Sequence, residues 1–252
     1  MKSEQWKPEL CPNRFASIAD TVLSNYEFSQ ILKSNKVTPE IAMYLGMRLD
    51  AVPQTFIPLL EALIDAAKKA GMEKLAKVAQ SNLDEENGMD PKTGETNVEK
   101  KHSSVRAYTR AAIESVLIDQ PDLLTVFNNP PPIEEYTRAV HSLIDQKNPL
   151  ELAGALALLE LLISKEYSAL LPVLQRLFPN LRLDQELKYF SNHAEHDEGH
   201  FNALLAAISE SAQTEKDINA VITGQLKIAL ARQKIFYEIF LFRLSLLRTT
   251  TP

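Results

Sequence analysis

Three side chains that can bind a metal recur within one short segment: His193, Asp197 and His200. In an α-helix, which turns by about 100° per residue, these three lie within a sector about 60° wide. Phe190 falls on the same side, so the three should point into an apolar core, whereas His196 at the edge should be exposed or lie behind the ligands. Two imidazoles and a carboxylate are costly to bury without partners, and a divalent metal would supply one. We therefore expect these three residues to be metal ligands. The alternative is a helix face rich in His, Asp and Glu that is exposed to solvent.

A further carboxylate occurs where an apolar residue would be expected. Glu160 interrupts the most apolar stretch of the chain, LAGALALLELLI. Ala153 and Ala157 lie two turns and one turn before it on the same face, which leaves room for another group to approach. A glutamate in such a setting should be protonated or bound to a metal. The alternative is a glutamate at the edge of the apolar stripe that pairs with a lysine such as Lys165.

The third group of candidates begins with the segment NLDEENG, residues 82–88, and continues at Glu99 and His102. Glu99 and His102 are one helical turn apart, as are Asp197 and His200. Two such acid-x-x-His units, with one glutamate on each of two other helices, form the ligand pattern of di-iron carboxylate bundles. Oxygen and nitrogen ligands without thiolate suit iron or manganese better than a structural zinc. Taken alone, the acidic run in residues 84–86 is typical of a solvated helix end.

The elements that must position these residues are helical almost everywhere. Apolar residues recur at helical spacing, and neither a strand of convincing alternation nor a repeat of solenoid period occurs. The sequence therefore predicts an all-α protein with one domain over 1–252, after an irregular lead at 1–13, and a polar loop at 87–98. The expected helices cover about 15–32, 38–49, 55–70, 72–86, 99–118, 133–146, 149–164, 167–178, 184–212 and 214–247.

The composition excludes several classes of protein. Of 252 residues, 45% are hydrophobic and only 7 are glycine, which disfavours phosphate-binding loops and barrels rich in β-turns. A net charge of −6 argues against a nucleic-acid partner. The single cysteine, Cys11, excludes an internal disulfide and a thiolate zinc site. Because there is neither a signal-like apolar segment near the N-terminus nor a membrane-spanning run, we expect a soluble, cytoplasmic protein with a small-molecule substrate and no membrane partner.

These motifs, taken together, resemble those of a known family. From about residue 15 to 247 the chain resembles the haem-oxygenase-like di-iron oxidases and oxygenases, relatives of the PQQ-synthase/thiaminase-like helical fold and of the chlamydial death-domain-associated protein. The resemblance implies a haem-oxygenase-like helical bundle that binds two Fe(II) ions per chain, with no catalytic residues beyond the metal ligands. The implied ligands are Glu86, His102, Glu160, His193, Asp197 and His200.

The chain departs from the family pattern in two places. The interval from Glu86 to His102 is longer than usual, so Glu85, Glu95 or Glu99 could replace Glu86 as the ligand. The thiaminase-like branch uses a cysteine nucleophile, whereas the only cysteine here lies far from every motif, which argues against thiamin hydrolysis. Haem oxygenase itself needs an early proximal histidine, and residues 14–34 contain none.

The resemblance also implies a reaction. Such enzymes use O2 as co-substrate and oxidise a small amino acid or fatty acid through a peroxo-diiron species, often in natural product biosynthesis. Our best single expectation is oxidative rearrangement with C–C cleavage of a tryptophan-like amino acid to a nitrile, as in some cyanobacterial members. The alternatives are oxidative decarboxylation of a fatty acid, N-oxygenation of an amine, and a non-catalytic metal-binding or interaction protein.

The last expected helix carries four aromatic residues, Phe236, Tyr237, Phe240 and Phe242, in a stretch that is apolar nearly all round. Such a stretch is typical of a buried core or of a contact between the two chains of a homodimer. The alternative is that these rings line the pocket of an aromatic substrate.

Overall fold

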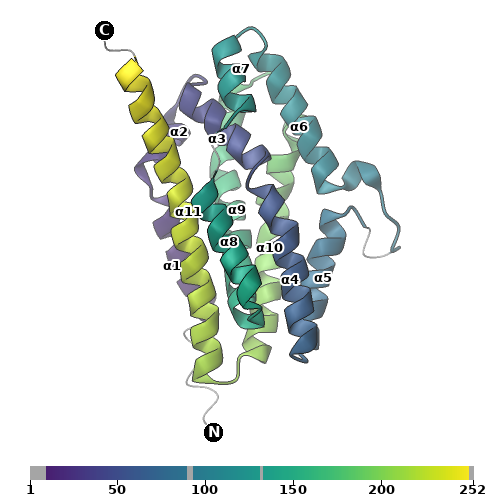
Figure 1. Cartoon of the computed structure of the whole chain (residues 1–252). Coiled ribbons are helices and arrows are strands. Elements are labelled where there is room, and N and C mark those ends of the chain that lie inside the picture. The colour runs from purple at the N-terminus through teal and green to yellow at the C-terminus, as the bar shows by residue number, and fades with distance from the viewer. Residues whose placement is uncertain (1–9, 90–92, 131–132, 250–252) are drawn as a thin grey trace.

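A computed structural model describes residues 10–89, 93–130 and 133–249 (Figure 1). The α-helices of this part are α1 (Pro12–Leu23), α2 (Tyr26–Lys33), α3 (Pro39–Leu49), α4 (Phe56–Lys69), α5 (Glu73–Glu86), α6 (His102–Leu117), α7 (Pro121–Asn128), α8 (Glu134–Gln146), α9 (Pro149–Leu177), α10 (Lys188–Ser211) and α11 (Glu215–Thr249). Short 3-10 turns occur at η2 (Pro53–Thr55) and η3 (Val98–Lys100). The described residues contain an isolated β-bridge, Met89 with Thr96, but no strand, so the expected all-α class is confirmed.

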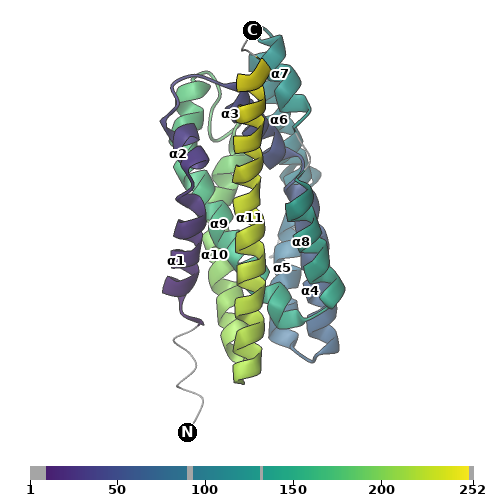
Figure 2. The same ribbon diagram turned by 60° about the vertical axis from the view of Figure 1, so that its left-hand side comes forward.

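The bundle is built around α9. This helix packs along α10 on one side and along α11 on another, while α4 pairs with α5 and α3 with α7. In Figure 1, α11 and the α4–α5 pair lie at opposite sides of the molecule, and Figure 2 shows α11 running along its length. Every residue from 152 to 164 is buried, which explains why this part of α9 is apolar around its whole circumference.

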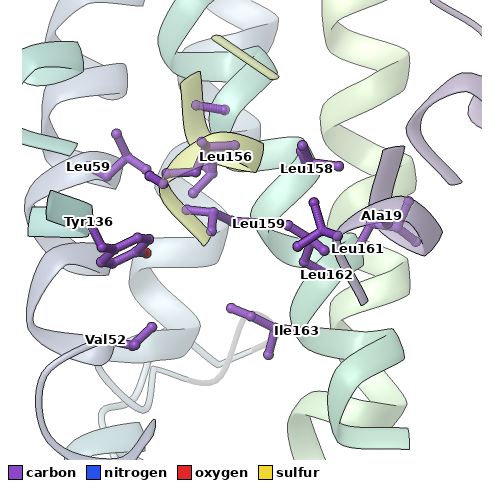
Figure 3. Packing of buried hydrophobic residues seen from close by; sticks show 14 of the residues in the cluster. Ala19, Val52, Leu59, Tyr136, Leu156, Leu158, Leu159, Leu161, Leu162 and Ile163 are labelled. Atoms are coloured by element: carbon purple, nitrogen blue, oxygen red, sulfur yellow. The ribbon is translucent and has the colours of Figure 1, made fainter. Parts of the chain in front are cut away.

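Side chains of α9 pack in several directions at once. Figure 3 shows Leu156 and Leu159 on the side of Leu59, a residue of α4. Leu158 and Leu162 lie on the side of Ala19, a residue of α1. Because every face of this stretch is buried, a charged side chain on it cannot reach water. Any carboxylate here therefore needs a partner within the protein.

The structure corrects the expected helix boundaries at the N-terminal end. Pro12, a favourable first residue of a helix, begins α1 inside the segment that we expected to be irregular; residues 1–9 of that segment lie outside the described part. The helix expected at 15–32 is two helices, because the Asn25 side chain caps a new one by accepting a hydrogen bond from the Glu27 amide.

The other differences lie in the C-terminal half. The break expected between 164 and 167 is absent, because Glu166 is buried with cationic partners and Lys165 reaches out to Asp20, so α9 continues through both. Helix α7, which opens with Pro121, was not predicted. No helix of the described residues is long and apolar enough to cross a membrane.

Candidate metal centre

The structure brings all six expected ligands together in two groups. Glu86, His102 and His193 form one group, and Glu160, Asp197 and His200 form the other. Within each group, one ligand atom from every residue lies within 4.8 Å of the ligand atoms of the other two. The residues come from the end of α5, the start of α6, the middle of α9 and the first half of α10. Segments far apart in the sequence therefore meet at one place in the bundle.

Helix α10 supplies three of the six. His193 Nδ1 lies 3.0 Å and 3.1 Å from the two carboxylate oxygens of Asp197, one turn further along the helix. His193 and Asp197 are buried and His200 is half-buried, as the common helical face predicts, whereas His196 is exposed. Asp197 Oδ1 is also 3.9 Å from His200 Nδ1, so this carboxylate lies between the two groups.

The turn after α5 sets Glu86 against His102. Gly88, with φ +75°, ends the helix, and its amide binds the Glu85 carbonyl. The chain then returns so that Asn97 donates its amide hydrogen to the Gly88 carbonyl, and α6 begins beside the end of α5. His102 Nδ1 lies 2.8 Å from Glu86 Oε1. The His102 ring stands nearly perpendicular to that of His193, with the ring centroids 4.8 Å apart.

The three alternatives to Glu86 lie at different places in the structure. Glu85 lies at the other group rather than beside His102, and its Oε2 is 3.0 Å from His200 Nε2. Glu95 and Glu99 are exposed and belong to neither group. The expected pairing of Glu99 with His102 on one face was wrong, because Glu99 lies on the 3-10 turn before α6 rather than on the helix itself.

Glu160 is only 1% exposed, and its partners among the described residues are an amide and a histidine, with no lysine or arginine among its ion pairs. Asn82 Nδ2 on α5 donates a hydrogen bond of 3.0 Å to Glu160 Oε1, and His200 Nδ1 lies 3.7 Å from Oε2. The alternative pairing with Lys165 is wrong, since that lysine binds Asp20. Asn82 was not singled out as a site residue, although it lies one turn before Glu86 on the same helix.

Burial and charge act against each other at these groups. Burial raises the pKa of Glu160 to about 7, with the nearby Asp197 carboxylate adding to the shift. Burial lowers the pKa of His193, but Asp197 outweighs this and brings the pKa to about 9. At His200 burial acts likewise, yet the Glu160 and Glu85 carboxylates beside it raise its pKa to about 11. The carboxylates therefore stabilise positively charged groups beside them.

The donor set fits a pair of divalent metal ions. With neutral imidazoles, the four carboxylates Glu85, Glu86, Glu160 and Asp197 carry four negative charges, which two divalent ions would neutralise. Among the ion pairs of the described residues, these carboxylates pair with histidine alone and with no lysine or arginine. Carboxylate and imidazole donors without thiolate suit iron or manganese.

A cavity of about 150 Å³ opens beside the first group, lined on one side by Glu86, His102 and His193. None of the four aromatic residues of the last helix lines it. Phe236 is buried in the core at 2% exposure, while Tyr237 and Phe240 are exposed, so the aromatic walls of this cavity come from other helices.

Comparison with known families decides the assignment. The family model described as "iron-containing redox enzyme" matches residues 85–233, a range that contains Glu85 and all six expected ligands. The chain belongs to this family. Membership of the iron-containing redox enzymes confirms the expected family and indicates iron as the metal and an oxidoreductase as the class of activity.

Solved structures show the same fold. A CADD-like protein of unknown function from Nostoc punctiforme has a TM-score of 0.68 at 18% identity, covering 95% of this chain and 94% of its own. A domain of unknown function with a haem-oxygenase-like fold from Shewanella denitrificans has a TM-score of 0.65 at 19% identity, with coverage of 95% and 94%. No curated protein matches the chain. The expected haem-oxygenase-like fold is thus confirmed.

Proposed function

We propose that this iron-containing redox enzyme is a non-haem di-iron oxidoreductase that uses O2 to oxidise a small organic substrate. The observation that carries the proposal is the pair of adjacent three-residue groups, with Asp197 between them: its carboxylate contacts His193 of one group and His200 of the other. A carboxylate in this position can serve both metals at once, and this favours a pair of ions over a single ion.

The protein's own residues hold and enclose the metals. Glu86, His102 and His193 would bind one ion, and Glu160, Asp197 and His200 the other, with Glu85 beside His200 as a further carboxylate. When bound, ferrous ions supply the electrons and the open coordination positions that O2 activation needs. Asn82 holds Glu160 in orientation, as partners behind a ligand commonly do.

The cavity beside the first group favours a small substrate. Its volume of about 150 Å³ is below the range of about 300–1,000 Å³ that is typical of pockets for drug-sized ligands. Tyr136, Tyr167 and Tyr189 contribute aromatic walls. We therefore favour an amino-acid-sized, aromatic substrate over a long-chain fatty acid, and conversion of a tryptophan-like amino acid to a nitrile remains our first reaction to test.

Anaerobic titration with Fe(II) tests the metal count. We expect about two iron ions per chain in the wild-type protein, fewer in Asp197→Ala, and an unchanged count in His196→Ala, the exposed control on the same helix. An unchanged count in Asp197→Ala, or one iron per chain in the wild type, would refute the di-iron arrangement.

Mixing the iron-loaded protein with O2 separates an enzyme from a metal-binding protein without turnover. We expect O2 consumption and a transient visible absorption that a suitable substrate accelerates, with products from a panel of aromatic amino acids and fatty acids read by mass spectrometry. Iron binding without any reaction with O2 would contradict the enzyme and favour metal storage or sensing.

A further inference from the structure

A buried arginine contributes to the wall of the cavity beside the candidate metal ligands. Arg48, on α3, is fully buried, and it lines the same cavity as Glu86, His102 and His193. Among the described residues none of its three guanidinium nitrogens has a hydrogen-bond partner, although Nε lies 3.2 Å from Glu166 Oε1 in an ion pair. A guanidinium carries five N–H donors in a planar fork, so a buried arginine without acceptors at its outer edge is costly.

The cluster around Arg48 contains more positive than negative charge. Glu166 is shared by two buried arginines, Arg48 and Arg232, and also accepts a hydrogen bond from the Tyr44 hydroxyl. Burial, with the Glu166 charge adding to it, raises the pKa of Tyr44 well above its usual value, so this hydroxyl stays neutral. Two guanidinium groups against one carboxylate leave one positive charge in excess among buried side chains.

The excess charge lies one tyrosine ring away from the metal ligands. Arg48 Cζ is 5.0 Å from the centroid of the Tyr167 ring, and that centroid is 5.9 Å from the centroid of the His193 ring. All three residues line the cavity, together with Arg106 of α6, a second arginine. A small molecule in the cavity therefore lies next to the arginine and to the first of the two groups, Glu86, His102 and His193.

We propose that Arg48 binds the carboxylate of a small monoanionic ligand in this cavity. The planar fork of a guanidinium matches a carboxylate, and one excess positive charge matches a monoanion better than a dianion such as phosphate. Apolar and aromatic side chains, among them Val52, Phe56 and Ile163, surround the rest of the ligand. The body of the ligand then lies toward Glu86, His102 and His193. That this ligand is the substrate rests on the proposed function, whereas the anion site itself does not.

Calorimetry on the metal-free protein isolates the anion site from any carboxylate bound directly to iron. The probes are 3-phenylpropanoate and 3-phenylpropanamide, which differ chiefly in charge. We expect the acid to bind at least tenfold more tightly than the amide, and Arg48→Met to remove this preference while amide binding stays the same. Equal binding of acid and amide to the wild type, no binding of either, or an unchanged preference in Arg48→Met would overturn the proposal.

Two further variants control for folding and for the choice of arginine. Arg48→Met leaves Glu166 paired with Arg232, so we expect it to fold with no loss of thermal stability. If it does not fold, Arg48→Lys is the substitute, because it keeps the charge but not the planar fork. We expect its preference for the acid over the amide to be smaller than in the wild type but not lost. Arg106→Met should retain most of the preference, and loss of the whole preference in this variant would overturn the assignment to Arg48. Because no iron is present, failure of the di-iron proposal would leave these results unchanged.

Discussion

The contact between α9 and α11 allows a sharp test of how closely these two helices pack. Gly224 of α11 faces the backbone of Glu151, and Gly154 of α9 faces the backbone of Val221, so the two antiparallel helices touch at two glycines. A Cβ atom added at Gly224 would lie 1.9 Å from the Glu151 carbonyl oxygen. Since the obstacle is backbone, no rotamer change can relieve it, and Gly224→Ala must push the helices apart.

The size of the effect follows from the distance. Ordinary van der Waals contact begins near 3.4 Å, so the helices must separate locally by about 1.5 Å, the difference from 1.9 Å. A gap of even about 0.5–1 Å forfeits a quarter to a half of each dispersion contact. Overpacking costs about 1–3 kcal/mol and sometimes more, and the better helix propensity of alanine offsets about 1 kcal/mol. Because the obstacle is backbone, we take the upper end of the overpacking cost, about 3 kcal/mol, and expect a net loss of about 2 kcal/mol, which lowers Tm by about 4–8 °C at this chain length.

Thermal and urea unfolding of the metal-free protein measure this loss. Gly199→Ala is the matched control, because Gly199 is helical and exposed and nothing lies within 4 Å of an added Cβ; it should gain up to about 1 kcal/mol. Gly154→Ala should resemble Gly224→Ala, and the double variant should cost less than the sum, since one separation of the helices relieves both clashes. A Tm within about 1 °C of wild type for Gly224→Ala, or full additivity, would refute this account of the contact.

Four other substitutions test the candidate metal centre and the ion pairs of α9. Gly88→Ala places a side chain at φ +75° and 2.4 Å from a carbonyl oxygen, so we expect a loss of at least about 1 kcal/mol in urea unfolding and weaker Fe(II) binding. Asn82→Leu removes the amide that binds Glu160, and Fe(II) titration should show affinity reduced by about 10–100-fold. Lys165→Ala removes an exposed ion pair and should change the free energy of unfolding by less than about 1 kcal/mol, whereas Glu166→Ala should cost about 3–5 kcal/mol because it leaves two buried arginines unpaired.

The part of the site that is local in sequence was predictable. The order of His193, Asp197 and His200 on one helix fixes their common face through the helical period alone. Glu160 was recognisable because a carboxylate within an unbroken apolar stretch has no face on which to meet water. In both cases the evidence lies within a few turns of one helix.

The parts that depend on packing between helices were not predictable. Whether Glu85 or Glu86 turns inward depends on how α5 lies against α10, and both reach the site, one in contact with each group. The continuity of α9 through Glu166 depends on two arginines from α3 and α11, which periodicity within α9 cannot reveal. The cavity and Arg48 were missed for the same reason, since a cavity is a property of several elements together.

The two buried glutamates of α9 show why the metals are assigned to one cluster and not the other. Glu160 and Glu166 are each 1% exposed, so both lose nearly all contact with water. Glu166 is paired with guanidinium groups and needs nothing more, whereas Glu160 has an amide and a histidine, and burial raises its pKa to about 7. Negative charge is in excess around Glu160 and positive charge around Glu166. His193 and Arg48 both line the cavity, so the same cavity borders a cluster with excess negative charge and a cluster with excess positive charge.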